Sequence, residues 1–312
     1  MVTLGDIDPG FGPGDDRRHR PEPGGRMRDS LFWELIMPEE QLGMQIYLYL
    51  TDRGRTGYNV VVWGERHAEP IALKLETGLV DDSADLDAFS FNGLTLKQPE
   101  LRKSCEVQFR SDDVNIDFNF EAIHDAFSYR SNPDGLPEWF AQNRLEQTGH
   151  VTGFLEVGPR RIEWDRIGHR DHSWGVRDWG VPHHWKWFVG YTEAGRVVNG
   201  WIWIAYGEWG FGGYVVKDRV TIPVRTIEHR AEYDDDMTQR RLEADLLDIT
   251  GEVTHLTMDS YGAVRLPTHD PMATVITEAA CAVTIDGEAG AGQFETHWSG
   301  PYLNYLAQRR RS

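Results

Sequence analysis

The sequence predicts an all-β protein of the sandwich or barrel type with few short helices, and three observations support this class. Apolar and polar residues alternate over many short segments, which is the pattern of half-buried strands. Gly, Pro, Asn and Asp residues separate nearly all of these segments. Only residues 137–148 have a helix-like pattern, in which Pro137 suits the first turn. Many short strands with few helices favour packed or closed sheets over a parallel α/β sheet.

The clearest strand is expected at 114–121, where Val114, Ile116, Phe118 and Phe120 alternate with polar residues. Further strands are expected at 45–50, 58–63, 70–75, 104–109, 149–157, 186–191, 196–205, 212–217, 251–258, 277–285 and 292–298.

The 312 residues are enough for two domains of similar size. Residues 1–30 hold ten Gly or Pro and no apolar run, so they are expected to form a flexible N-terminal arm. An N-terminal β domain is expected over 31–165, and a C-terminal β domain over 166–312.

Charge and motifs exclude several classes of function. The formal net charge of −18 disfavours a nucleic-acid partner. Two distant cysteines, Cys105 and Cys281, exclude a disulfide scaffold and a thiolate metal site. No signal-type or membrane-spanning apolar run is present, which favours a cytoplasmic protein. The GxSxG, GxxxxGK[ST] and strand-GxGxxG-helix patterns are missing, so no cofactor is expected.

Tryptophan marks the segment where function is expected. Eight of the 12 Trp residues fall between 164 and 209. If residues 169–175 are extended, Arg170, His172 and Trp174 share one face, and an imidazole beside an indole is a candidate general acid or base. Asp171, Asp178, Arg170 and Arg177 are close enough in sequence to orient or charge this imidazole. The same residues would also suit a buried ion-pair network between the domains.

Two further groups in this region have alternative interpretations. His169, His172, His183 and His184 could supply imidazole ligands, but their spacing matches no standard metal motif, so no metal is predicted. Trp201 and Trp203 share a strand face that would suit either a cavity wall or ordinary sheet packing. Tyr206 and Glu208 would form either a hydroxyl–carboxylate pair at a barrel rim or an exposed turn.

The string Asp171, His172, Ser173, Trp174, Gly175 resembles the Asp-His-x-Trp-Gly signature of the superfamily of carotenoid 1,2-hydratases, AttH-like proteins and kievitone hydratases. The resemblance implies two tandem lipocalin-like β domains. It also implies cofactor-independent addition of water to an isoprenoid alkene, with cyclisation or dehydration as related outcomes. His172 and Trp174 would then be pocket residues. The carotenoid enzymes have a Tyr-x-Asp pair further along, whereas the matching strand here has Asn199, Trp201 and Trp203, followed by Tyr206-x-Glu208. Either Glu208 replaces that acid, or His172 or Asp178 supplies the proton, or the hydratase chemistry is absent.

The sequence therefore predicts a hydratase, cyclase or isomerase-type lyase acting on a hydrophobic terpenoid, steroid or prenylated aromatic substrate. The expected catalytic residues are His172, Asp171, Asp178, Tyr206 and Glu208, and the expected substrate-binding residues are Trp174, Arg170, Arg177, Trp201 and Trp203. The alternative is a non-catalytic, lipocalin-like binder of an apolar small molecule.

Overall fold

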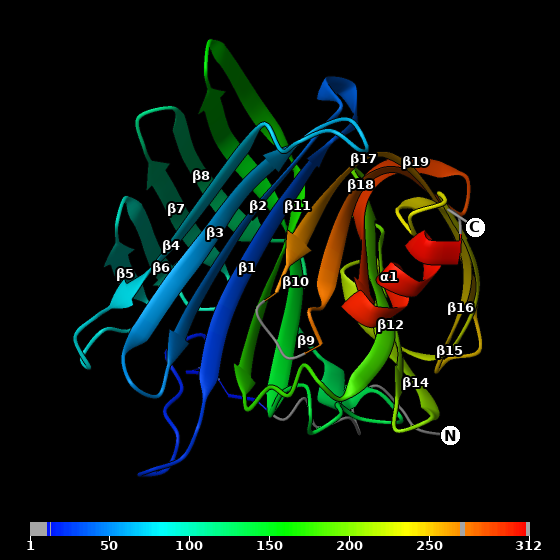
Figure 1. Ribbon diagram of the computed structural model, residues 1–312, viewed down its shortest axis with the longest axis horizontal. Helices are drawn as coiled ribbons and strands as arrows, with labels where there is room; N and C mark the ends of the chain where they lie inside the picture. The colour runs from blue at the N-terminus through cyan, green and yellow to red at the C-terminus, as the bar shows by residue number, and fades with distance from the viewer. Residues whose placement is uncertain (1–10, 13, 269–271, 310–312) are drawn as a thin grey trace.

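The computed structural model describes residues 11–12, 14–268 and 272–309, and nearly all of its regular structure is antiparallel sheet. Figure 1 shows two assemblies, a curled sheet from the N-terminal half and a closed barrel from the C-terminal half. The all-β prediction is confirmed. No helix of the described residues has the length and hydropathy of a membrane-spanning segment.

The N-terminal sheet has 11 strands, ten of them in the order β4-β3-β2-β1-β11-β10-β8-β7-β6-β5, with β9 paired to β10. Its first and last strands, β1 and β11, are neighbours, so the chain returns to its starting point before the barrel begins. The strands are β1 (Arg28–Met37), β2 (Leu42–Thr51), β3 (Arg55–Trp63), β4 (Ala72–Leu79), β5 (Ala88–Phe91), β6 (Leu94–Glu100), β7 (Ser104–Arg110), β8 (Val114–Ala122), β9 (Phe127–Ser128), β10 (Asn143–Val157) and β11 (Arg160–Gly175).

The barrel consists of eight strands in sequence order and closes where β12 pairs with β19. Its strands are β12 (Pro182–Thr192), β13 (Val197–Ala205), β14 (Glu208–Lys217), β15 (Val220–Tyr233), β16 (Gln239–Asp248), β17 (Val253–Pro267), β18 (Val275–Ile285) and β19 (Glu288–Trp298). Among the described residues, the helices are two single 3₁₀ turns, Pro38–Glu40 and Tyr129–Ser131, and α1 (Gly300–Arg309).

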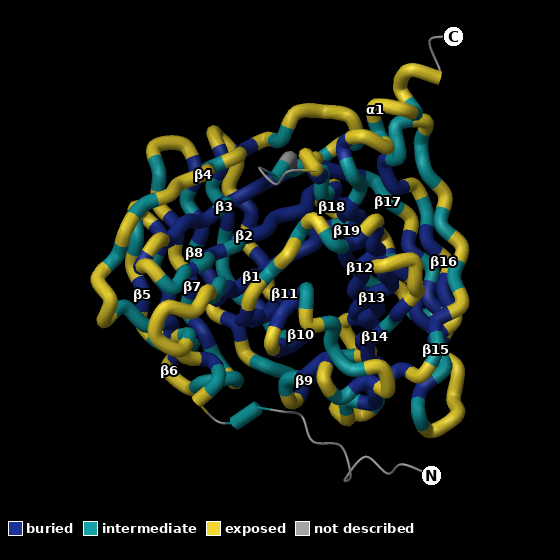
Figure 2. Tube along the Cα trace, turned by 60° about the horizontal axis from the view of Figure 1, so that its bottom comes forward, coloured by how far each residue is buried: buried dark blue, intermediate teal, exposed yellow. Residues whose placement is uncertain are grey.

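Each assembly has its own apolar core, and a third cluster joins them. The N-terminal sheet buries Leu31 and Trp33 with the alternating residues of β8. The barrel interior is filled by side chains from all eight strands, including Phe188 and Phe294. The third cluster lies between the assemblies and contains Phe32 and many of the tryptophans. In Figure 2 the strands that meet there, among them β1, β11 and β12, are mostly buried.

The helix expected at 137–148 is wrong. The amide of Phe140 donates to the carbonyl of Pro137 in a turn, and β10 starts at Asn143. Residues 143–157 pair with β11 along their whole length, so sheet hydrogen bonds override the local helix pattern. The helix that does form, α1, was not expected.

The expected boundaries also shift. The division at residue 165 falls inside β11, and the chain passes from sheet to barrel between Gly175 and Pro182. Residues 1–10 and 13 of the expected flexible arm lie outside the described residues. The described part of that arm is anchored, because Asp16 is fully buried and Arg18 is 7% exposed. The prediction of a flexible arm is therefore corrected for this part.

Candidate functional site

A cavity of about 630 Å³ lies between the N-terminal sheet and the outer wall of the barrel. Strands β1 to β4, β10 and β11 form one side of it, and β12, β13, β17, β18 and β19 form the other. Its volume is typical of small-molecule sites, which commonly range from about 300 to 1,000 Å³.

Strand alternation explains why the cavity is outside the barrel. Phe188 and Ile202 point into the filled interior, so Trp187 and Trp201, one position away on β12 and β13, point outward. These two tryptophans are directly opposite each other in the strand pairing. Trp185 adds a third indole to the same wall.

Two glutamates continue this row. Glu295 of β19 is opposite Trp187, and Glu278 of β18 is opposite Glu295. The register therefore places two carboxyl groups and two indoles side by side across four neighbouring strands, in the order Glu278, Glu295, Trp187, Trp201. All four line the cavity.

The two carboxyl groups interact with each other and with polar neighbours. Gln293 donates to Glu278 at 2.6 Å, and the indole N–H of Trp185 donates to Glu295. Burial raises the pKa of Glu278 well above its usual range, and the adjacent Glu295 raises it further. Burial also raises the pKa of Glu295. Two buried carboxyls in contact cannot both ionise easily, so the pair holds a proton more strongly than an ordinary carboxyl group does.

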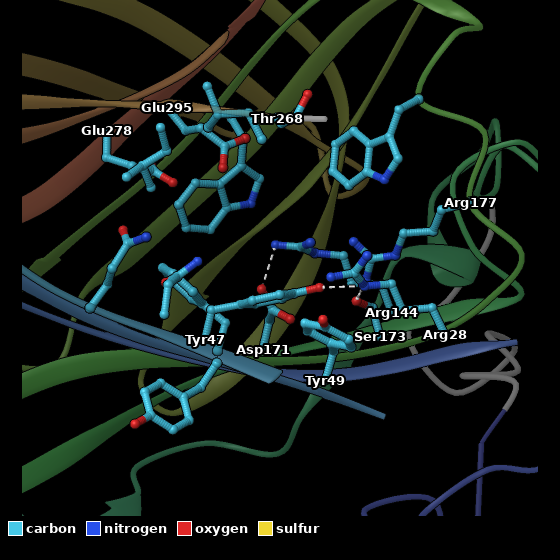
Figure 3. Close-up of a pocket in the computed structure, with 18 of the residues that line it drawn as sticks. Arg28, Tyr47, Tyr49, Arg144, Asp171, Ser173, Arg177, Thr268, Glu278 and Glu295 are labelled. Carbon is cyan, nitrogen blue, oxygen red and sulfur yellow. Dashed lines mark hydrogen bonds and ion pairs between the residues drawn. The ribbon is translucent and has the colours of Figure 1, made fainter. Parts of the chain in front are cut away.

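Arginines gather in another part of the cavity. Figure 3 shows Arg28, Arg144 and Arg177 together on one side of the view and the two glutamates on the other. The Nε of Arg28 donates to the Tyr47 hydroxyl at 3.0 Å. Burial alone would raise the pKa of Tyr47, but the positive charges of Arg28 and Arg177 lower it below its ordinary value.

Asp171 connects this group to a buried network. Its carboxylate is 2.8 Å from Arg144, which also pairs with Glu146. Glu146 in turn contacts His169 and accepts from the indole of Trp187 at 3.1 Å. Burial raises the pKa of Asp171, although Arg144 opposes the shift.

His172 lies on the opposite side of β11. It is opposite Leu31, whose side chain belongs to the N-terminal core, whereas Asp171 is opposite Phe32, which faces the barrel. Its Nε2 is 2.6 Å from Asp29 and its Nδ1 is 3.3 Å from Asp16. Burial alone would lower the pKa of His172, but these two carboxylates raise it to about 9.

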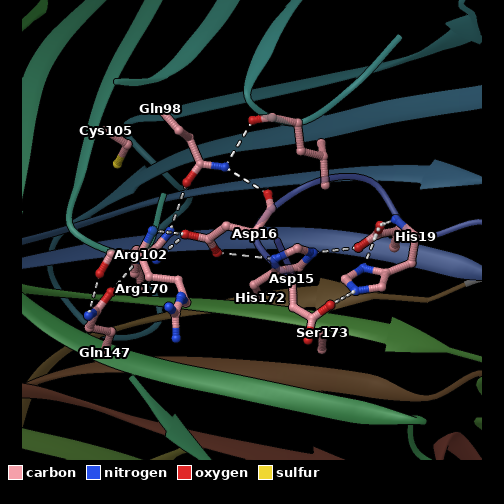
Figure 4. A network of polar contacts seen from close by, with 12 residues as sticks. Asp15, Asp16, His19, Gln98, Arg102, Cys105, Gln147, Arg170, His172 and Ser173 are labelled. Atoms are coloured by element: carbon pink, nitrogen blue, oxygen red, sulfur yellow. Dashed lines mark hydrogen bonds and ion pairs between the residues drawn. The ribbon is translucent and has the colours of Figure 1, made fainter. Parts of the chain in front are cut away.

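This network anchors the chain that precedes β1, as Figure 4 shows. Asp16 accepts from Arg170 at 2.7 Å, and His19 stacks on Trp174 with ring centroids 3.8 Å apart. Donor atoms of His19, Asp29 and His172 lie within 4.8 Å of one another, a spacing that could hold a metal ion. Both nitrogens of His172 already contact carboxylates, so ion pairs alone account for the cluster.

The residues expected from the sequence thus divide into two sets. Those that line the cavity are Asp171, Arg177 and Trp201. Those outside its lining are His172, Arg170 and Trp174 in the anchoring network, Asp178 and Glu208 at exposed positions, Tyr206 in a turn with 75% exposure, and Trp203, which packs behind Trp201. Sequence reasoning missed Glu278, Glu295, Tyr47, Arg28 and Arg144. One local signal was Glu278, the single acid of the otherwise weakly polar β18; β19 contains both Glu288 and Glu295, so its sequence does not single out Glu295.

Comparison with known proteins supports the fold resemblance. A family model described as a domain of unknown function (DUF7064) matches residues 12–300. A Nitrosomonas europaea protein assigned to AttH superposes with a TM-score of 0.59 at 14% identity, covering 88% of this chain and 93% of its own. Kievitone hydratase from Nectria haematococca gives 0.57 at 11%, covering 86% and 87%. CghA with Sch210972 gives 0.57 at 11%, covering 88% and 89%. No curated protein sequence matches.

Proposed function

The chain belongs to the DUF7064 family, and from the chemistry of its cavity we propose that it is a cofactor-independent hydratase, cyclase or isomerase-type lyase. Its substrate is a hydrophobic terpenoid, steroid or prenylated aromatic compound. The observation that carries this proposal is the row Glu278, Glu295, Trp187 and Trp201, which sets a buried carboxyl pair beside indole faces in one cavity.

The carboxyl pair supplies the proton. A carboxyl group that stays protonated near neutral pH can donate to an alkene carbon when it is shielded from bulk water. The raised pKa of both Glu278 and Glu295 supports this role. Of the two, Glu295 is adjacent to the indoles in the row, so we assign the donated proton to Glu295 and the stabilising partner role to Glu278.

The tryptophans stabilise the cation that protonation creates. An indole face attracts a desolvated cation by up to about 2 kcal/mol. Water addition to that cation, followed by return of one proton from the added water to the carboxylate pair, completes a hydration without net consumption of protons. Attack by a second double bond of the substrate forms a ring and a new cation, which loses a proton to the carboxylate pair to complete cyclisation. Loss of a proton from a carbon of the first cation to the same carboxylate pair gives isomerisation.

Proton transfer from the pair is tested by isotope incorporation. The purified protein is incubated in deuterated water and in ¹⁸O water with farnesol, farnesoic acid, a prenylated isoflavonoid and a 5-ene steroid. Carbon-bound deuterium is expected in every one of the three outcomes, and ¹⁸O only in hydration. Glu295→Gln is expected to lower incorporation by a factor of about 10² or more.

Two controls make the result specific. Glu228→Gln removes an exposed glutamate from β15 and leaves incorporation unchanged. Quenching of Trp fluorescence by the same compounds reports binding separately from turnover, and Glu295→Gln retains it. Tight binding without incorporation by the unaltered protein would favour the alternative, a carrier of apolar molecules. Incorporation that survives both Glu278→Gln and Glu295→Gln would assign the proton to another group.

A further inference from the structure

Two guanidinium groups face the cavity without a carboxylate partner. Arg28 and Arg177 both line it and are both partly buried. Neither has an acidic group within 4.0 Å among the described residues, in contrast to Arg144, which pairs with Asp171 and Glu146. A partly buried cation without a paired anion loses solvation that neutral hydrogen-bond partners replace only in part.

The donors of these groups are only partly used. Arg28 donates from Nε to Tyr47, and its guanidinium carbon is 4.0 Å from the Tyr49 ring centroid. No described residue accepts from its two terminal nitrogens. Arg177 donates from Nη2 to Ser30 at 2.8 Å and to Ser173, while its buried Nε has no partner. Several N–H groups at this end of the cavity are therefore available to a ligand.

The charges at this end also repel each other. Burial lowers the pKa of Arg177, and the nearby Arg28 and Arg144 lower it further, whereas Tyr47 opposes the shift. Tyr47 lies beside both unpaired arginines, and their charges influence its hydroxyl. An anion placed between Arg28 and Arg177 would relieve this repulsion.

We propose that the substrate carries an oxyanion headgroup, a carboxylate or a phosphate monoester, which Arg28 and Arg177 bind while its apolar body extends along the tryptophan wall. The planar guanidinium group matches the geometry of both oxyanions, and charge-assisted hydrogen bonds are stronger than hydrogen bonds between neutral groups. This inference deepens the proposed function and rests on it, since it assigns the substrate class of the same cavity.

The headgroup would also orient the reacting carbon. In Figure 3 the labelled arginines and the two glutamates lie on opposite sides of the view. A substrate fixed at the arginines presents carbon atoms at a set distance from its headgroup to Glu295. Such positioning decides which double bond is protonated.

Binding of matched compounds tests the proposal without turnover. Trp fluorescence titrations compare farnesoic acid with methyl farnesoate and farnesol, and a steroid acid with its methyl ester. The acids are expected to bind at least about tenfold more tightly than the neutral compounds, because a hydrogen bond to a charged group contributes more than one between neutral groups. Farnesyl monophosphate separates the two oxyanions, since the headgroup that binds more tightly is the one assigned.

Variants locate the effect. Arg28→Met and Arg177→Met each abolish the preference for acids, whereas Arg225→Met, an exposed position on β15, retains it. Thermal unfolding confirms that each variant is folded, and Arg28→Lys, which keeps a positive charge, retains part of the preference if Arg28→Met does not fold.

The outcomes separate this inference from the proposed function. Equal binding, or no binding, of acids, esters and alcohols across both carbon skeletons overturns the oxyanion proposal. If deuterium incorporation still depends on Glu295 in that case, the proposed function stands without it. A strong preference for acids without any deuterium incorporation supports the oxyanion site and contradicts the proposed proton-transfer function.

Discussion

Asp171 and His172 are consecutive residues of β11 whose side chains project to opposite sides of the sheet. Asp171 lines the cavity and pairs with Arg144 at 2.8 Å. His172 lies in the N-terminal core between Asp16 and Asp29. One strand thus contributes to a candidate binding site with one side and anchors the preceding chain with the other, so its two faces should respond differently to substitution.

Replacing His172 should lower the free energy of unfolding of the protein without altering the cavity. His172→Gln leaves two buried carboxylates without their shared cation, and such a loss costs about 3–5 kcal/mol in the free energy of unfolding. Asp171→Asn should cost less, because Arg144 keeps Glu146 as a partner. Urea denaturation measures both losses, and fluorescence titration with farnesol measures binding. A His172→Gln protein of unchanged stability that no longer turns over substrate would instead identify His172 as catalytic.

The contribution of His172 to stability should depend on pH. Its pKa is about 9 in the folded protein, against 6.5 for an ordinary histidine, so the folded state binds the proton more tightly. The stabilisation is therefore fully present below pH 6.5 and is lost as the pH rises through about 9. The difference in unfolding free energy between the unaltered protein and His172→Gln should shrink between pH 6 and pH 10. A difference that stays constant over this range would contradict the protonated state.

Lys186 should destabilise the protein at neutral pH. Its side chain shares the inner face of β12 with Phe188, is 8% exposed in total, and has no acidic partner within 4.0 Å among the described residues. Burial lowers its pKa to about 8 from 10.5, which corresponds to roughly 3 kcal/mol favouring unfolding below pH 8. Lys186→Met should raise the melting temperature at pH 7, and this gain should disappear as the pH approaches 10.5.

The control for Lys186 is Lys97→Met, which removes an exposed amine of β6 and should leave the melting temperature nearly unchanged. If Lys186→Met lowers the melting temperature at pH 7, then contacts of the amine outweigh its burial cost.

A methyl group at Gly262 should weaken the contact between the two assemblies. Gly262 of β17 forms an isolated bridge with Glu65, which follows β3. A Cβ at this position would lie 2.1 Å from the backbone oxygen of Gly64, so the backbone would have to move. Gly262→Ala should cost about 1–3 kcal/mol by overpacking. Gly180→Ala, where the nearest atom would be 3.4 Å away, serves as the control in urea denaturation; equal midpoints for the two variants would show that the contact adapts.

Much of the fold was predictable because it depends on local alternation. The strand at 114–121 and the shared face of His172 and Trp174, whose ring centroids are 5.2 Å apart, both follow from a period of two. Alternation does not tell which face of a strand meets a second sheet. His172 was therefore expected in the pocket, although Asp171, on the opposite face, is the one that lines it.

The carboxyl pair was missed for a related reason. On β18, Glu278 alternates with residues of the barrel core such as Ala279 and Cys281, a pattern that normally places an acid in water. Here the N-terminal sheet covers the outer wall and buries it. Its partner, Glu295, lies beside it because of the register in which β18 and β19 pair, and the composition of the chain does not predict that register.

The closure of the barrel has a consequence for synthesis on the ribosome. The indoles of β12 and β13 emerge long before β18 and β19, and β12 gains its last neighbour only when β19 pairs with it. A nascent chain that ends after β13 therefore already contains the outward-facing tryptophans Trp187 and Trp201, but not the strands that carry the carboxyl pair. Until translation passes Trp298, β19 cannot close the barrel, and exposed aromatic surface of this kind is what makes incompletely folded chains prone to aggregation.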